Sequence, residues 1–194
     1  ILIAPSWGPM GLLETCGIEL IEVLLSIGHH VTVRPHPQTR RNYPEKLEAI
    51  KSKFQSNRSF LYEDNNLSWE SFYSAHIMIS DWSGAALEFA FSLERPVLYI
   101  DVPKKVNNPE YDVTHLNPLE VELRSAIGKI LSPDSLEQAG HCVEEMCTKL
   151  QSYSERIRIA RSQWIYNISC SGEKGAEAIL EIVNGSKVQG NLKK

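Results

Sequence analysis

Short apolar runs alternate with stretches of helical periodicity over the first hundred residues. The apolar runs are rich in Ile, Val, Leu and Tyr, which is typical of buried strands; they lie at 1–5, 30–34, 59–62, 77–80 and 97–101. Helices are expected between them, at 16–27, 44–54, up to about 75, and from 84 towards Pro96. This alternation predicts an α/β fold, a Rossmann-like doubly wound parallel sheet in the order 3-2-1-4-5.

The last third of the chain is predicted to be a helical C-terminal extension. Asn117-Pro118 and Ser132-Pro133 each place a capping residue before a proline, which predicts helices at 118–131 and 133–151. Further helices are expected up to about 164 and at 173–184. We therefore expect a single domain over 1–185 followed by a flexible tail at 186–194. The chain opens inside a strand-like run at Ile1, so we expect a fragment with a further domain upstream.

Composition limits the classes of function. A net charge of −4 and a pI of 5.9 give no general attraction to nucleic acid. No apolar run reaches the roughly 18 residues that span a bilayer, and we see no secretory signal. The four cysteines show no CxxC pair; reduced thiols in a cytoplasmic protein explain them, with a disulfide or a metal site as the alternative.

The segment 77–101 is the most informative part of the sequence. A short strand is followed by Asp81-Trp-Ser-Gly84, then by a helix, and then by a second strand after Pro96. Ligands bind at the carboxyl ends of strands in open α/β sheets. The amides and the dipole of the following helix favour an anion there, such as a phosphate.

Arg34-Pro-His36-Pro37 follows the second predicted strand. Arg34 and His36 point the same way in an extended segment, and the prolines stiffen the backbone. One interpretation is a phosphate clamp in which His36 donates a hydrogen bond or acts as a general acid. The other is a structural Arg paired with a carboxylate, beside a packed His.

The loop after the fourth strand also has two interpretations. Ser80, Asp81 and Ser83 can simply form a turn and a helix cap. Alternatively, Ser83 and the amide of Gly84 contact a phosphate oxygen. Glu88, further along the helix, either pairs at the surface or binds a ribose diol.

The loop 6–11 contains two glycines but matches neither GxGxxG nor the P-loop, which argues against a dinucleotide cofactor or an ATPase. Ser6 and Trp7 lie at its start. Trp7 and Trp82, each in a loop after a strand, either stack on a base or plug the edge of the sheet. We find no HExxH motif, no paired cysteines and no GxSxG elbow, so no metal site, cofactor or hydrolase serine is predicted.

Several motifs taken together resemble the C-terminal half of the CDP-glycerol glycerophosphotransferases, the teichoic acid polymerases and primases, which have a GT-B architecture. The similarity covers residues 1–101 and a late segment; it rests on Ala4-Pro-Ser-Trp7, Arg34-Pro-His-Pro37, Ser80-Asp-Trp-Ser-Gly84 with Glu88-Phe89, Arg95-Pro-Val-Leu-Tyr-Ile-Asp101 and Gly172-Glu-Lys-Gly175-Ala.

The resemblance implies roles for individual residues. His36 corresponds to the family histidine that meets the phosphates of the donor, Ser83 to a hydroxyl near the pyrophosphate, and Glu88 to the acidic residue later in the helix. This chain has Trp82 where the family has tyrosine and Gly84 where it has a second serine. The identity of the donor therefore stays open between CDP-glycerol and another nucleotide-activated sugar or polyol.

The resemblance also implies that the catalytic base and the acceptor lie in an N-terminal domain that this chain lacks, so we expect donor binding without turnover. Our first hypothesis is the donor-binding domain of a glycosyl- or glycerophosphotransferase, with no nucleic-acid partner and with peripheral membrane association an option for the parent protein only. The alternatives are a UDP-sugar 2-epimerase-like domain and a non-catalytic interaction module.

Overall fold

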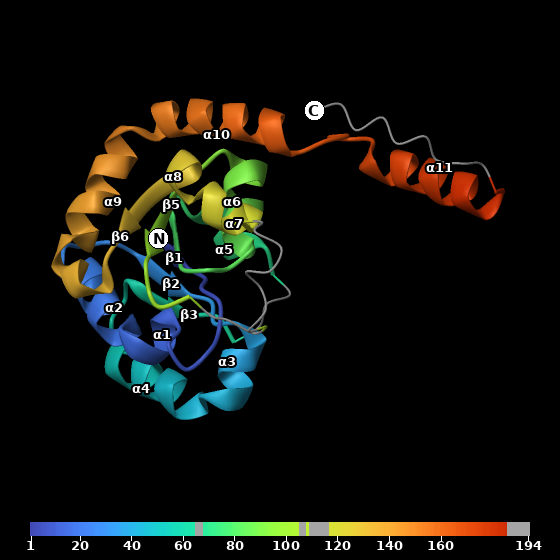
Figure 1. The fold of residues 1–194 in the computed structure, drawn as a ribbon. Helices are drawn as coiled ribbons and strands as arrows, with labels where there is room; N and C mark the ends of the chain where they lie inside the picture. Colours follow the sequence, from blue (N-terminus) through green and yellow to red (C-terminus); the bar gives the residue numbers. More distant parts are fainter. Residues whose placement is uncertain (65–67, 105–107, 109–116, 186–194) are drawn as a thin grey trace. The chain divides into compact units, whose positions relative to one another are not determined.

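A parallel sheet forms the centre of the compact unit Ile1–Ala160 (Figure 1). The structure is a computed structural model, and it describes residues 1–64, 68–104, 108 and 117–185. Within these residues the sheet has six strands in the order β3-β2-β1-β4-β5-β6. All strand pairs are parallel. The strands are β1 (Leu2–Ile3), β2 (Val31–Val33), β3 (Phe60–Tyr62), β4 (Met78–Ser80), β5 (Val97–Ile100) and β6 (Gly128–Leu131).

The strand order confirms the predicted 3-2-1-4-5 and adds a sixth strand. The order reverses between β1 and β4, which are paired through Leu2 with Met78 and Ile3 with Ile79. In a doubly wound sheet, the loops after the two strands at such a reversal diverge to opposite faces and leave a crevice. The loops after β1 and β4 are those that carry Trp7 and Asp81.

Helices cover both faces of the sheet. Right-handed crossovers place α1 to α4 on one face and α5 to α8 on the other, an arrangement visible in Figure 1. The bounds are α1 (Leu12–Thr15), α2 (Gly17–Ser26), α3 (Pro37–Asn42), α4 (Pro44–Phe54), α5 (Glu70–Ser74), α6 (Ala85–Leu93), α7 (Leu119–Glu122), α8 (Arg124–Ile127), the 3₁₀ helix η2 (Pro133–Gln138), α9 (Ala139–Thr148), α10 (Leu150–Trp164) and α11 (Ser171–Val183).

The sixth strand corrects the predicted helix at 118–131. The region forms two single-turn helices, α7 and α8, and then β6, which pairs with β5 through Gly128 and Val97. A Cβ at Gly128 would lie 1.8 Å from the carbonyl oxygen of Val97. The glycine is therefore required where the edge strand approaches β5, and pairing with the sheet outweighs the local helical pattern.

Helix α3 lies between the second predicted strand and the helix predicted at 44–54, where no helix was expected. Its sequence lacks apolar periodicity, but His36 caps its N-terminus and Pro37 occupies its first turn. The helix expected at 44–54 is confirmed as α4 with its proline in the first turn. The helix expected at 16–27 is confirmed as α2, and a single-turn helix that was not predicted, α1, precedes it.

The C-terminal third is helical, as predicted, but it is more divided. Ser132 accepts a hydrogen bond from the amide of Asp134, which confirms the predicted cap, yet it starts η2 rather than one helix over 133–151. Helices η2 and α9 pack against α2. The chain separates into two compact units, Ile1–Ala160 and the part from Arg161 onward, which contains α11. The tail predicted at 186–194 lies outside the described residues.

The core of the first unit lies between the sheet and its helices. The central strands contribute side chains with no exposed surface, among them Leu2, Ile3, Met78 and Ile79, and Phe89 of α6 is equally buried. Among the described residues, no helix has both the length and the apolar content needed to cross a membrane.

Candidate functional site

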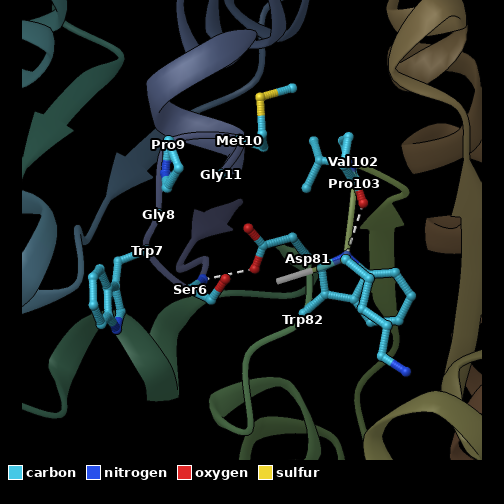
Figure 2. Close-up of a pocket in the computed structure, with 11 residues that line it drawn as sticks. Ser6, Trp7, Gly8, Pro9, Met10, Gly11, Asp81, Trp82, Val102 and Pro103 are labelled. Atoms are coloured by element: carbon cyan, nitrogen blue, oxygen red, sulfur yellow. Dashed lines mark hydrogen bonds between the residues drawn. The ribbon is translucent and has the colours of Figure 1, made fainter. Parts of the chain in front are cut away.

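The loops at the carboxyl ends of the strands enclose two neighbouring cavities, and a third lies between α5 and α6. The central cavity, of about 170 Å³, is lined by residues that include Arg34, His36, Ser83 and Glu88. The front cavity, of about 290 Å³, is lined by the loop 6–11, Asp81, Trp82 and residues 102–104 (Figure 2). The outer cavity, of about 300 Å³, is lined by Trp69, Phe72, Tyr73, Glu88, Ser92 and Leu93.

His36 lies in the wall of the central cavity as the cap of α3. Its Nδ1 accepts a hydrogen bond from the amide of Gln38 at 3.1 Å. In the neutral imidazole this places the proton on Nε2, which makes that atom a donor. The imidazole also stacks on Trp7, with ring centroids 6.2 Å apart. The tautomer and the ring plane of His36 are therefore both fixed by neighbouring groups.

Arg34 is buried beneath the same cavity, with 9% of its side chain exposed. Its Nη1 donates to the carbonyl oxygen of Ser68 at 2.8 Å and lies 3.6 Å from Glu63. Its guanidinium also lies over the rings of Trp69 and Phe72, at 5.7 and 5.4 Å. Arg34 therefore holds the start of α5 against the sheet while it also lines the cavity. Its pairing with Glu63 agrees with the interpretation of Arg34 as a structural residue, and its contact with a phosphate stays a prediction.

Ser83 and Glu88 face the cavity from the first turns of α6. The Ser83 hydroxyl accepts a hydrogen bond from the amide of Ala85 at 3.3 Å, which confirms the predicted turn, whereas the N-cap of α6 is Gly84. Ala85 lines the cavity too, which places the first turn of α6 at its wall. Glu88 lines both the central and the outer cavity. Gly84 is exposed between Ser83 and α6, and a Cβ added to it would meet nothing within 4 Å.

Asp81 binds the protein rather than presenting a free carboxylate. It is 1% exposed, and its two oxygens accept the amides of Ser6 at 2.6 Å and Leu12 at 3.3 Å. Figure 2 shows Asp81 at the base of the front cavity, bonded to Ser6. The carboxylate thus holds the loop after β1 against the loop after β4 and shapes the cavity.

Ser80 is a correction to the predicted binding residues. It has no exposed surface, and its hydroxyl donates to the carbonyl oxygen of Ala4 at 2.9 Å. Because that bond joins β4 to the end of β1, Ser80 supports the sheet below the cavities and does not line the central or front cavity.

Trp82 forms a wall of the front cavity, and its ring is fixed. Its indole N–H donates to the carbonyl oxygen of Val102 at 2.8 Å (Figure 2). The guanidinium of Arg124 lies 4.0 Å from the ring centre, 4.9 Å from the ring of Tyr99, and 2.8 Å from the carboxylate of Asp101. Burial raises the pKa of the Tyr99 hydroxyl, so this ring stays neutral beside the guanidinium.

Glu14 is a buried carboxyl that the sequence did not single out. It is 4% exposed; its Oε1 accepts the Thr39 hydroxyl at 2.9 Å, and its Oε2 is buried without a hydrogen-bond partner. Burial raises its pKa. Oε2 would be 2.4 Å from a Cβ at Gly11, so the carboxyl fits only because residue 11 is a glycine. Glu14 links α1 to α3, the helix that His36 caps.

The aromatic residues of the outer cavity were also not predicted. Trp69 is 54% exposed and Tyr73 is 65% exposed. Trp69 packs edge-on against Phe72, which in turn packs against Phe89 of the core. The signal available in the sequence was the run Trp69-Glu-Ser-Phe-Tyr73, in which three of five residues are aromatic.

Residues of the kinds that bind metals do not gather among the described residues: no group of three His, Cys, Asp or Glu side chains could hold an ion there. All four cysteines lie in described regions and are free thiols.

Comparisons with known proteins identify the fold. No family model and no curated sequence matches the chain. A UDP-GlcNAc 2-epimerase from Methanocaldococcus jannaschii, in complex with UDP-GlcNAc and UDP, matches with a TM-score of 0.51 and 18% identity over 84% of this chain and 44% of that one. The wall teichoic acid polymerase TagF matches with a TM-score of 0.56 and 18% identity over 96% of this chain and 44% of that one.

The fold is that of one Rossmann-like half of a GT-B protein. A TagF variant solved with CDPG matches at 0.55 and 16% identity over 96% of this chain and 43% of that one. This chain spans less than half the length of these proteins. At such identities the likeness shows the fold alone, and the predicted Rossmann-like architecture is confirmed.

Proposed function

We propose that this chain is the donor-binding domain of a GT-B transferase that uses a nucleotide-activated donor, a glycosyl- or glycerophosphotransferase of surface-polymer synthesis. One observation carries the proposal: residues from two segments, Arg34 and His36 after β2 and Ser83 and Glu88 after β4, line one cavity at the reversal of the sheet. The UDP and UDP-GlcNAc of the epimerase complex and the CDPG of the TagF variant support it.

The three cavities suggest an order for the parts of the donor. The diphosphate lies in the central cavity, where the first turn of α6 and the Ser83 hydroxyl favour an anion. Glu88, shared with the outer cavity, takes the ribose hydroxyls. The base then lies in the outer cavity against Trp69, whose exposed ring offers a stacking surface.

His36 is assigned to the leaving phosphate. With Nδ1 accepting the Gln38 amide, Nε2 keeps its proton and donates a hydrogen bond to the departing nucleotide phosphate. The attacking hydroxyl and its base belong to the acceptor domain that we propose for the parent protein. On this assignment the chain binds the donor and turns over nothing by itself.

Calorimetric titration tests the proposal. CDP, UDP, CDP-glycerol and UDP-sugars are each titrated into the wild-type chain, the His36→Ala variant and the His141→Ala variant. His141 is the matched control, because its side chain is exposed and it does not line the central cavity. We expect at least one pyrimidine nucleotide to bind to the wild-type chain. Its affinity should fall by about tenfold or more in His36→Ala and stay unchanged in His141→Ala. Absence of binding by every nucleotide would overturn the proposal in favour of a non-catalytic module.

A further inference from the structure

The front and central cavities lie on two sides of the same pair of loops. After β1, Pro5 lines the central cavity and Ser6 the front cavity; after β4, Ser83 lines the central cavity and Trp82 the front cavity. Adjacent residues are separated by only about 3.8 Å between their Cα atoms. The two cavities therefore adjoin each other at this edge of the sheet, and a group bonded to a phosphate in the central cavity lies close to the front cavity.

The walls of the front cavity are mostly apolar. Met10, Val102, Pro103 and the ring of Trp82 surround it, and its base is the carboxylate of Asp81 (Figure 2). That carboxylate already accepts two backbone amides. The cavity therefore offers a ligand hydrophobic surfaces, with polar groups such as the Ser6 hydroxyl at one side.

We propose that the front cavity takes the transferred group of the donor and that this group is a pyranose sugar rather than glycerol. This inference rests on the proposed function and decides between the two donor classes that it leaves open. A pyranose ring has a face of C–H groups that packs on an indole or a proline, with hydroxyls at its rim. Glycerol has no such face, because it is an acyclic chain of three carbons with no ring to hold C–H groups on one side.

The size of the cavity agrees with this choice. Its volume is about 290 Å³, close to the lower end of the roughly 300–1,000 Å³ of small-molecule sites. A hexose of about a dozen non-hydrogen atoms fills such a space, whereas glycerol would leave much of the apolar wall in contact with water.

The Trp82 wall is rigid, which suits recognition of a flat ring face. The bond from its indole N–H to Val102 fixes its edge, and the guanidinium of Arg124 covers the ring at 4.0 Å. Arg124 is itself only 4% exposed and is anchored to Asp101. A sugar that packs here finds a surface already in place, so little ordering entropy is lost on binding.

Calorimetry with matched ligands tests the inference. The wild-type chain is titrated with UDP, UDP-glucose, UDP-GlcNAc, CDP and CDP-glycerol, and each activated compound is compared with its own nucleoside diphosphate. We expect at least one nucleotide sugar to bind about tenfold or more tightly than the diphosphate alone, and CDP-glycerol to bind no more tightly than CDP. A gain for CDP-glycerol without one for any sugar, or no gain for any compound, overturns the inference.

Two variants locate the gain in the front cavity. Trp82→Ala removes the fixed ring, and Met10→Ser changes a side chain that is 51% exposed. Each variant is expected to reduce the sugar gain, the ratio of the affinity for a nucleotide sugar to that for its nucleoside diphosphate, severalfold. The affinity for the diphosphate itself should stay within about twofold of wild type. Trp164→Ala, in α10, is the control. If both variants leave the sugar gain intact, the inference is wrong. If no nucleotide binds at all, the proposed function fails and this inference fails with it.

Discussion

Trp7 stacks on His36, with their ring centroids 6.2 Å apart and their planes inclined by 25°. The stack joins the loop after β1 to the cap of α3 and holds the imidazole over the central cavity. Replacing Trp7 with Ala should reduce the free energy of unfolding by about 1 kcal/mol, the range measured for aromatic pairs, and weaken nucleoside diphosphate binding severalfold. Trp7→Phe should recover most of both. Urea unfolding and calorimetry measure them, and unchanged affinity in Trp7→Ala would show that His36 is positioned without the stack.

Asp81→Asn should release the loop after β1. The buried carboxylate accepts two amides, and an amide side chain keeps only one acceptor oxygen for them. We expect a loss of about 1.5–3 kcal/mol in unfolding free energy, as for hydrogen bonds to charged groups. The exposed Asp134 provides the control, and Asp134→Asn should leave stability nearly unchanged. Equal urea midpoints for Asp81→Asn and wild type would contradict this role.

Glu14 should make stability depend on pH. Its pKa in the folded protein is raised by burial above its ordinary value of 4.5. Below pH 4.5 the carboxyl group of Glu14 is protonated in both the folded and the unfolded protein, so its burial does not lower the free energy of unfolding. As the pH rises through 4.5 towards the raised pKa, the unfolded protein ionises first and the wild type loses stability.

Glu14→Gln removes that titration and keeps an acceptor for the Thr39 hydroxyl. The stability of Glu14→Gln relative to wild type should therefore increase as the pH rises above 4.5 and level off once the pH exceeds the raised pKa of Glu14. Glu19→Gln, at an exposed position in α2, should show no such trend. Urea unfolding at a series of pH values provides the comparison; a difference that does not vary with pH would show that Glu14 is ionised in the folded protein as easily as in the unfolded one.

Gly128→Ala should weaken the edge of the sheet. The added methyl would overlap the carbonyl oxygen of Val97, so β6 must shift away from β5. Overpacking of this kind costs about 1–3 kcal/mol. Gly172→Ala is the matched control, because nothing lies within 4 Å of its added methyl and it lies in α11; it should be neutral or stabilise by up to about 1 kcal/mol. Similar unfolding free energies for the two variants would contradict the packing described here.

The elements that were predicted correctly are those whose signals are local. Pro44 and the apolar spacing that follows it define α4 without reference to any other part of the chain. The strand β6 was missed because the residues from Gly128 to Leu131 continue a helical pattern in the sequence. Only their pairing with β5 holds this backbone in the extended conformation of a strand. Helix α3 was missed because its stability comes from a cap at His36 and a proline, not from an apolar face.

The candidate site was predicted in part for the same reason. The sequence shows which loops follow strands, so it predicts His36, Ser83 and Glu88 as candidate site residues, and the structure adds that they line one cavity. Glu14 was not found, because a carboxyl in an apolar run is informative only once Thr39, twenty-five positions later, is seen beside it. Arg124 was missed likewise, since its partner Trp82 is distant in the sequence.

The place of β1 in the sheet has a consequence for biosynthesis. Of the six strands of the sheet, β1 is synthesised before the others but lies between β2 and β4, so one of its edges stays open until Met78–Ser80 has left the ribosome. Contacts of such long sequence separation form slowly, and an unpaired apolar edge invites association with other chains. Nascent chains that stop before β4 should therefore depend on chaperones, whereas those extended through β5 should become resistant to aggregation.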